Sequence, residues 1–203
     1  MKKLLATLAL FALVSSPALA AEGPVIGQPA PAFTATDSNG KTVSLADQKG
    51  KTVVLEWTND GCPFVQKHYE SGNMQSLQKA AAADGVVWFS VISSAAGKQG
   101  HVDGEGANKL TADRNAAPTA VLLDESGVVG KAYGAKTTPH MFIIDKDGIL
   151  AYRGAIDSIP SPDKADVEKA EKYVANALAD LKAGRPVATA DTQAYGCGVK
   201  YKD

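Results

Sequence analysis

The chain contains very few cysteines and no clustered metal ligands. Its 203 residues include two cysteines, Cys62 and Cys197, and three histidines. There is no C-x-x-C or H-x-x-x-H spacing, so the sequence offers no zinc motif and we expect neither a metal nor another cofactor. An isolated pair of cysteines in an oxidising compartment is expected to be either bonded or redox-active.

An excess of charge of one sign is also absent. The chain has 21 Lys and Arg against 22 Asp and Glu, a formal net charge of −1. No basic cluster with interleaved aromatic residues is present, which argues against a nucleic-acid partner. A hydrophobic content of 45% is ordinary for a globular protein, and the length suffices for one domain with a core that does not depend on disulfides.

Only one long apolar run occurs, and it lies at the start of the chain. Two lysines precede it, it spans residues 4–14, and an Ala-Leu-Ala sequence precedes Ala21. This pattern predicts a Sec-type signal peptide over residues 1–20 and a domain over residues 21–203. No later run is long enough to span a membrane. We therefore expect an exported, soluble, periplasmic protein with no stable membrane association.

Strand and helix patterns alternate along the rest of the chain. Ala32–Leu45 reads as a hairpin that turns at Asn39-Gly40, and residues 149–154 close a second hairpin with residues 140–145. The other expected elements are strands at 52–58, 86–92 and 119–123, and helices at 63–69, 74–83 (capped by Asn73), 107–115 and 163–181. A polar tail over residues 187–203 carries Cys197. This order predicts an α/β sandwich around a mixed sheet.

Cys62 lies at a strand-to-helix junction. It follows the strand that ends at Thr58 and precedes Pro63, a preferred first residue of a helix. The unpaired N–H groups and the positive dipole end of a helix start favour a thiolate over a thiol. The alternative is a small buried hydrophobic residue, as free cysteine usually is.

Four segments resemble the peroxiredoxin-like branch of the alkyl hydroperoxide reductase/thiol-specific antioxidant (redoxin) group in the thioredoxin superfamily. They are residues 59–65 (Asn-Asp-Gly-Cys-Pro-Phe-Val), Thr137-Thr138-Pro139, the hairpin over residues 142–148, and Tyr195-Gly196-Cys197. The resemblance covers about residues 26–201. It implies a thioredoxin-like three-layer sandwich with a central mixed sheet, an N-terminal hairpin extension and a C-terminal tail.

The sequence departs from the cysteine motifs of these families in two ways. Thioredoxins place a second cysteine where Val65 stands, so the usual resolving thiol is missing. A peroxiredoxin P-x-x-x-T/S-x-x-C motif ending at Cys62 would require proline at Leu55 and serine or threonine at Asn59. Cys62 therefore resembles the first nucleophile of thioredoxin rather than a peroxidatic cysteine.

The resemblance also implies roles for residues outside the helix start. It makes Thr138-Pro139 a cis-proline loop facing Cys62, whose backbone pairs with an extended substrate, so we expect Thr138, Pro139 and Pro63 to bind the substrate. Glu56 stands where thioredoxins place a buried proton acceptor, with a raised pKa. The alternative for Glu56 is a partly solvated carboxylate, and for His68 a surface or packing residue is favoured over a functional one.

Two roles remain open for Cys197. It could resolve a mixed disulfide or sulfenic acid on Cys62, or form a permanent disulfide clamp with it. The first role predicts an exported thiol-disulfide oxidoreductase, in which Cys62, Cys197 and Glu56 are catalytic and the partners are protein thiols or disulfides and a periplasmic electron donor. The alternatives are a weak peroxidase acting on a small hydroperoxide, or a redox-silent binding module.

Overall fold

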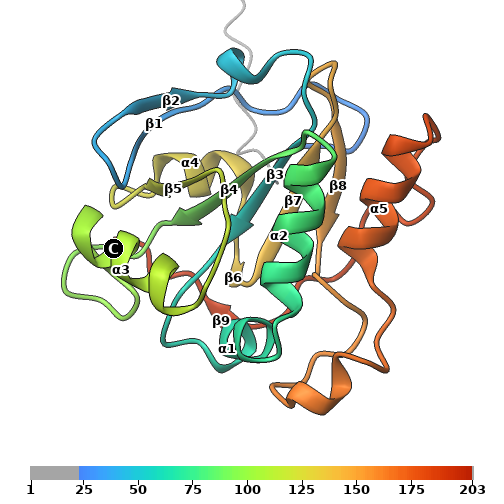
Figure 1. Cartoon of the computed structure of the whole chain (residues 1–203). Helices are drawn as coiled ribbons and strands as arrows, with labels where there is room; N and C mark the ends of the chain where they lie inside the picture. Colours follow the sequence, from blue (N-terminus) through green and yellow to red (C-terminus); the bar gives the residue numbers. More distant parts are fainter. Residues whose placement is uncertain (1–22, 203) are drawn as a thin grey trace, which may run out of the picture.

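A mixed sheet of seven strands forms the centre of the protein in the computed structural model, which describes residues 23–202. The strands lie in the order β2-β1-β5-β4-β3-β7-β8 (Figure 1). Their bounds are β1 (Thr34–Asp37), β2 (Thr42–Ser44), β3 (Val53–Trp57), β4 (Val87–Ile92), β5 (Ala120–Leu123), β7 (His140–Ile144) and β8 (Leu150–Gly154). β3 pairs parallel with β4 and antiparallel with β7. A separate two-stranded sheet joins β6 (Thr137–Thr138) to β9 (Cys197–Gly198).

Helices cover both faces of the central sheet. They are α1 (Pro63–Glu70), α2 (Asn73–Ala83), α3 (Gly104–Asp113), α4 (Val128–Tyr133) and α5 (Tyr173–Lys182). α1, α2 and α5 share a buried cluster with Val54 of β3, whereas α4 packs with Leu55 and Trp57 on the opposite face. Figure 1 shows α2 crossing the front of the sheet between α3 and α5. The predicted three-layer α/β arrangement is confirmed.

The composition of β3 explains its central place. All five of its residues are buried, as expected for a strand that is covered on both faces. Side chains alternate between the faces, so Glu56 points with Val54 into the layer under α1 and α2. A short loop over residues 58–61 connects the end of β3 to Cys62 at the start of α1.

Both predicted hairpins are confirmed. β1 pairs antiparallel with β2 across a turn that contains Gly40, and β7 pairs antiparallel with β8 across a turn that contains Gly148. The two glycines have φ values of +78° and +82°, a backbone conformation that side chains disfavour. Turn chemistry is local, which is why the sequence shows it directly.

The single long helix expected over residues 163–181 is wrong. Lys164–Asp166 form only a 3-10 turn, and the α-helix begins at Tyr173. Between them, the Ser158 N–H donates to the Glu171 carbonyl and the Glu171 N–H donates to the Ser158 hydroxyl. The backbone groups that a continuous helix would pair internally are thus paired with a distant loop, and amphipathic spacing cannot reveal such a contact.

Smaller differences concern other helix starts. Gly72, with a φ of +76°, occupies the cap position of α2, and Asn73 is its first residue rather than its cap. α3 begins at Gly104 instead of residue 107. α4 was not expected; the Asp124 carboxylate organises it by accepting hydrogen bonds from two N–H groups of its first turn.

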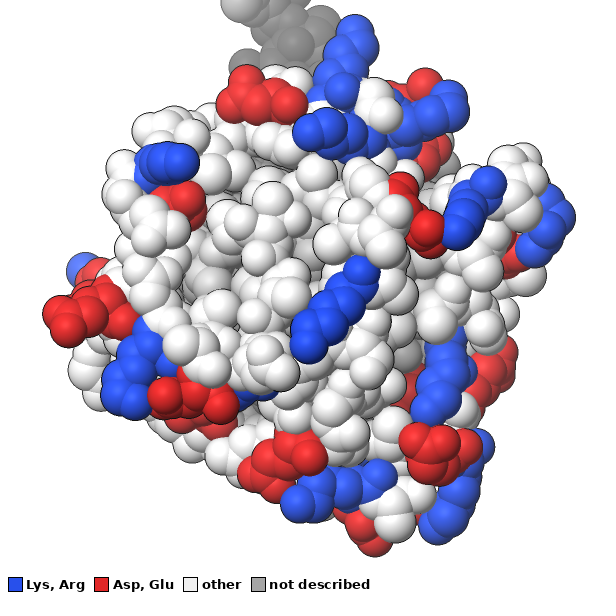
Figure 2. All heavy atoms as spheres, in the orientation of Figure 1, with Lys and Arg blue, Asp and Glu red and all other residues white. Residues whose placement is uncertain are grey.

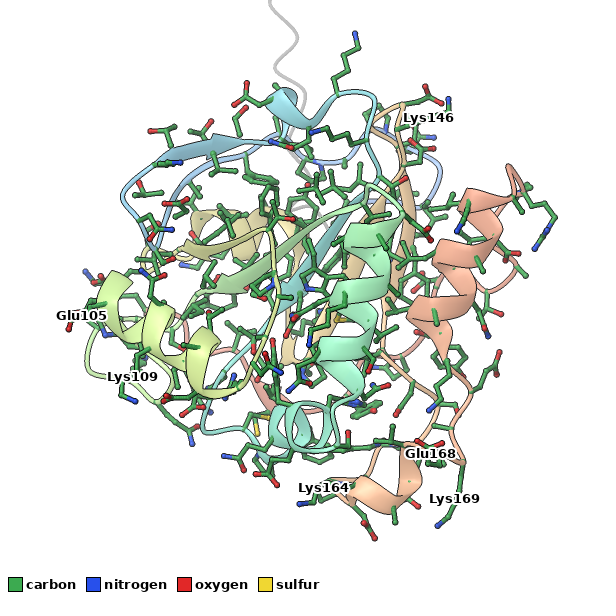
Figure 3. All side chains as sticks on the ribbon, viewed as in Figure 1. Glu105, Lys109, Lys146, Lys164, Glu168 and Lys169 are labelled. Carbon is green, nitrogen blue, oxygen red and sulfur yellow. The ribbon has the colours of Figure 1, made fainter. Side chains whose placement is uncertain are left out.

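The predicted signal peptide over residues 1–20 lies outside the described residues. Within residues 23–202, no helix has both the length and the apolar character that crossing a membrane requires. On the face drawn in Figure 2, acidic and basic side chains are interspersed around a mostly uncharged central area, across which a basic side chain also lies. The labelled Lys and Glu side chains of Figure 3 lie at the periphery, on α3, the β7–β8 turn and the segment around residues 164–169.

Candidate functional site

Cys62 is the N-cap residue of α1. Its backbone is extended, its carbonyl accepts the first helical hydrogen bonds, and Pro63 takes the first helical position, as the sequence predicts. Its side chain is 0% exposed. Reaction at this sulfur therefore requires whatever covers it to move.

Thr138, the residue before Pro139, lies against Cys62. The Thr138–Pro139 bond is cis, in agreement with the expectation from the resemblance. In its thiol form, Cys62 donates a hydrogen bond to the Thr138 carbonyl oxygen at 3.0 Å. The substrate-binding roles expected for Thr138, Pro139 and Pro63 remain predictions; of the three, Thr138 hydrogen-bonds to Cys62.

The C-terminal tail completes the site. β9 pairs antiparallel with β6 so that Cys197 lies opposite Thr138, and the side chain and backbone N–H of Cys197 both hydrogen-bond to Cys62. Both cysteines are thiols in the structure. The fold thus brings the two cysteines of the sequence together although they lie 135 positions apart along the chain. The disulfide between them remains a prediction.

The environment distinguishes the two thiols. Burial raises the pKa of the Cys62 thiol, but hydrogen bonds from Cys197, Thr138 and Val65 outweigh it and hold that pKa below its ordinary value. Burial, the hydrogen bond to Cys62 and the negative charge of its thiolate raise the pKa of Cys197 to about 11. Cys62 is therefore the thiol of the pair that ionises more readily, and Cys197 is the one that keeps its proton and can donate a hydrogen bond to the Cys62 thiolate.

Glu56 lies within the core, so the alternative of a partly solvated carboxylate is wrong. Its side chain is 0% exposed, and burial raises its pKa against the effect of its hydrogen bonds. The carboxylate accepts hydrogen bonds from Tyr69 on α1, Gln78 on α2, and Trp88 and Ser90 on β4, at 2.7–3.2 Å. These contacts bind α1 and α2 to the sheet. The proton-transfer role expected for Glu56 remains a prediction.

A second buried polar cluster lies beside the cysteine pair, and the sequence did not reveal it. Lys67 of α1 pairs with Asp157 at 3.2 Å, and both side chains are at most 2% exposed. His68 is buried next to them, and burial lowers its pKa to about 4, so its ring is neutral at pH 7. Tyr195 of the tail donates its hydroxyl to the Asp157 carboxylate. Asp157 and Lys67 carry no local motif; only Tyr195, two residues before Cys197, offered a signal.

No group of three or more His, Cys, Asp or Glu side chains that could hold a metal ion occurs within residues 23–202. Two of the histidines, His68 and His140, are buried, and the third, His101, approaches Glu125 at the surface. The groups that the site does bring together are two thiols, one with a lowered pKa, beside the edge of β6 with which the tail strand β9 pairs.

Comparison with known proteins agrees with this chemistry. A model described as the AhpC/TSA family matches residues 26–153. A thiol-disulfide oxidoreductase ResA from Bacillus thuringiensis subsp. konkukian is 32% identical over 123 residues, which is 61% of this chain and 65% of that protein. A ResA from Bacillus anthracis is 31% identical over the same shares. The match thus spans slightly less than two thirds of these relatives.

Two solved structures support the fold over a longer stretch. An uncharacterized conserved protein from Geobacillus kaustophilus shares 28% identity and a TM-score of 0.74, covering 93% of this chain and 98% of that one. A thiol:disulfide interchange protein from Bacteroides sp. shares 24% identity and a TM-score of 0.52, covering 72% of this chain and 90% of that one. The latter likeness concerns the fold alone.

Proposed function

Because the chain belongs to the AhpC/TSA family, we propose that it is a thiol-disulfide oxidoreductase in which Cys62 and Cys197 alternate between two thiols and one intramolecular disulfide. The observation that carries the proposal is the contact between the two sulfurs: a thiol with a lowered pKa at a helix start and a second thiol that hydrogen-bonds to it. The similarity to ResA over 61% of the chain supports the same class of reaction.

The reaction that this pair supports has two exchanges. The Cys62 thiolate attacks one sulfur of a partner disulfide, forms a mixed disulfide and releases the other partner sulfur as a thiolate. Cys197 then attacks the Cys62 sulfur and displaces the first partner sulfur, which leaves as a thiolate and takes up a proton. The partner disulfide gains two electrons, and the Cys62–Cys197 pair loses two. A periplasmic electron donor returns the pair to the reduced state.

The raised pKa of Cys197 fits this order of events. The charge on Cys62 contributes to that shift, and it disappears when Cys62 enters a mixed disulfide. Cys197 therefore becomes easier to ionise at the step in which it must attack. The thiolate released from the partner in the first exchange is a base that can accept its proton.

The remaining assignments extend the proposal. Thr138, Pro139 and Pro63 bind the partner segment beside the Cys62 sulfur, and Glu56 serves as a buried proton acceptor beneath α1. Export to the periplasm rests on the two lysines, the apolar run over residues 4–14 and the small residues before Ala21.

A redox titration tests the proposed function. Protein isolated from the periplasm is equilibrated at defined glutathione potentials, quenched, and mapped under non-reducing conditions. We expect one Cys62–Cys197 disulfide that is reduced in the range of the glutathione and thioredoxin systems, and Cys197→Ser should accumulate mixed disulfides at Cys62 whereas Cys62→Ser should not.

Three other results would replace the proposal. A bond reduced only below about −300 mV, with no trapped partner, identifies a structural clamp. Oxidation of Cys62 by hydroperoxide faster than by any disulfide identifies a peroxidase. Two thiols that never pair, with Cys62 inert toward disulfides, identify a redox-silent binding module.

A further inference from the structure

The tail occupies the place that the proposed function reserves for a partner. Cys62 is 0% exposed, and β9 covers it by pairing with Thr137–Thr138, the strand directly before Pro139. The Val199 N–H also donates to the Lys136 carbonyl and extends this pairing by one residue. A partner sulfur that Cys62 attacks must therefore take the position of the Cys197 sulfur, and the tail must leave first.

The conformation of Gly196, the tail residue before Cys197, limits which residue can precede a cysteine that binds at this position. Gly196 has a φ of +134°, and a Cβ built on it would lie 2.0 Å from the Thr138 carbonyl oxygen. In the thiol form of Cys62, that oxygen also accepts a hydrogen bond from the Cys62 sulfur at 3.0 Å. Any segment that follows the path of the tail thus needs glycine immediately before its cysteine.

The residue before that glycine occupies a built site. We call the side chains around Tyr195 the Tyr195 site: Phe64, Lys67, His68 and Asp157. Phe64 meets the Tyr195 ring edge-on at 5.8 Å between centroids, and the Lys67 ammonium lies 5.7 Å from the ring centroid.

The hydrogen bonds of the Tyr195 site fix the phenol hydroxyl. The Asn73 amide donates to Nδ1 of the neutral His68 ring, so Nε2 carries the proton and faces the Tyr195 oxygen at 3.4 Å. The Tyr195 hydroxyl in turn donates to the Asp157 carboxylate. The site therefore offers a donor and an acceptor to a phenol, together with an aromatic edge and a cation.

We propose that β6 and the Tyr195 site bind an extended segment of a partner protein with the order tyrosine, glycine, cysteine, and that the tail is an internal occupant of that docking site. This inference rests on the proposed function. The segment adds a strand to Thr137–Thr138, as β9 does, and places its cysteine sulfur against Cys62. Cys62 bonds to that sulfur, and the sulfur previously bonded to it departs as a thiolate with the electron pair.

Activated peptides test the inference on the full-length chain. Cys197→Ser retains a tail residue of similar size and leaves Cys62 as the single thiol. The probes are blocked tetrapeptides, Tyr-Gly-Cys-Gly and its variants with Phe or Ala at the first position or Ala at the second, each carrying thionitrobenzoate on the cysteine sulfur. Attack by Cys62 releases thionitrobenzoate, which is followed by its absorbance. The same disulfide of free cysteine reports general access to Cys62.

We expect Tyr-Gly-Cys-Gly to react fastest. Replacing its tyrosine by alanine, or its glycine by alanine, should slow the reaction at least about tenfold. The loss of a hydrogen bond to a charged group, or of a close contact, weakens binding by about this factor. Replacing the tyrosine by phenylalanine should give an intermediate rate. In Asp157→Asn the preference for tyrosine over phenylalanine should disappear. In Tyr195→Phe, which weakens the hold of the tail without removing the site, every peptide should react faster and the order should persist.

Equal rates for all peptides and for the free-cysteine disulfide would overturn the docking site and leave the proposed oxidoreductase intact. Reaction of the free-cysteine disulfide without reaction of any peptide would show that the tail is a permanent occupant, which also overturns the inference. If Cys62 reacts with none of the disulfides, the proposed function fails and the inference falls with it.

Discussion

Gly196→Ala should separate the two sulfurs without touching either of them. The new methyl group would lie 2.0 Å from the Thr138 carbonyl oxygen, and the φ of +134° at this position is one that alanine disfavours. Gly198→Ala is the matched control on the same strand, because a Cβ built there has a single neighbour, the Lys136 carbonyl oxygen at 4.0 Å, and no unusual φ.

The magnitude follows from the backbone. Holding alanine in a conformation that only glycine readily adopts costs of order 1–3 kcal/mol, even before the clash is counted. If the tail lifts to avoid that cost, the Cys62–Cys197 disulfide loses the same amount of stability. For a two-electron couple, this raises the reduction potential by about 20–65 mV. The pKa of Cys62 should also rise, since it loses the hydrogen bonds from Cys197 that lower it.

Equilibration with glutathione buffers, followed by alkylation and mass spectrometry, measures this potential for the native chain and both variants. We expect the shift in Gly196→Ala and a change of less than about 10 mV in Gly198→Ala, which corresponds to under 0.5 kcal/mol. Equal potentials for Gly196→Ala and the native chain, with circular dichroism unchanged, would refute the claim that this glycine holds the tail against the cis-proline loop.

Three further outcomes are expected. Thiolate absorbance at 240 nm should rise in two steps, a lower one that Cys62→Ser removes and one near pH 11 that Cys197→Ser removes; a single step at an ordinary thiol pKa would contradict the assignment. Because burial raises the pKa of Glu56 in the folded protein, native stability should fall as the pH rises above about 4.5, and denaturant unfolding of Glu56→Gln should lack that component; parallel pH profiles would contradict it. Asp157→Ala should lower the free energy of unfolding by about 3–5 kcal/mol by leaving a buried lysine unpaired, whereas Asp113→Ala, in an exposed ion pair, should lower it by less than about 1 kcal/mol; similar losses in urea titrations would disprove the buried pair.

The features that the sequence predicted are those with a local cause. A cysteine before a proline at the end of a buried run predicted the helix start at Cys62, and turn glycines predicted the hairpins. The cis bond before Pro139 was predicted by resemblance, not by local pattern.

The features that the sequence could not show depend on contacts between distant segments. The break before α5 arises because residues 171 and 158 bond to each other, and the ion pair of Lys67 with Asp157 joins positions that are 90 residues apart. The antiparallel seating of Cys197 on Thr138 is of the same kind. Two thiols in one chain implied a meeting of sulfurs, but only the folded chain shows which of them is buried.

The separation of the two cysteines along the chain has a mechanical consequence. In a C-x-x-C motif both sulfurs belong to one helix turn, so their spacing is fixed by that turn. Here the segment matched by the family model, residues 26–153, supplies Cys62, and an appended strand beyond it supplies Cys197. The effective concentration of one thiol at the other is set by the fraction of time that β9 is paired with β6. A molecule that binds β9, or that displaces it from β6, therefore shifts the reduction potential of the two cysteines without contacting either sulfur.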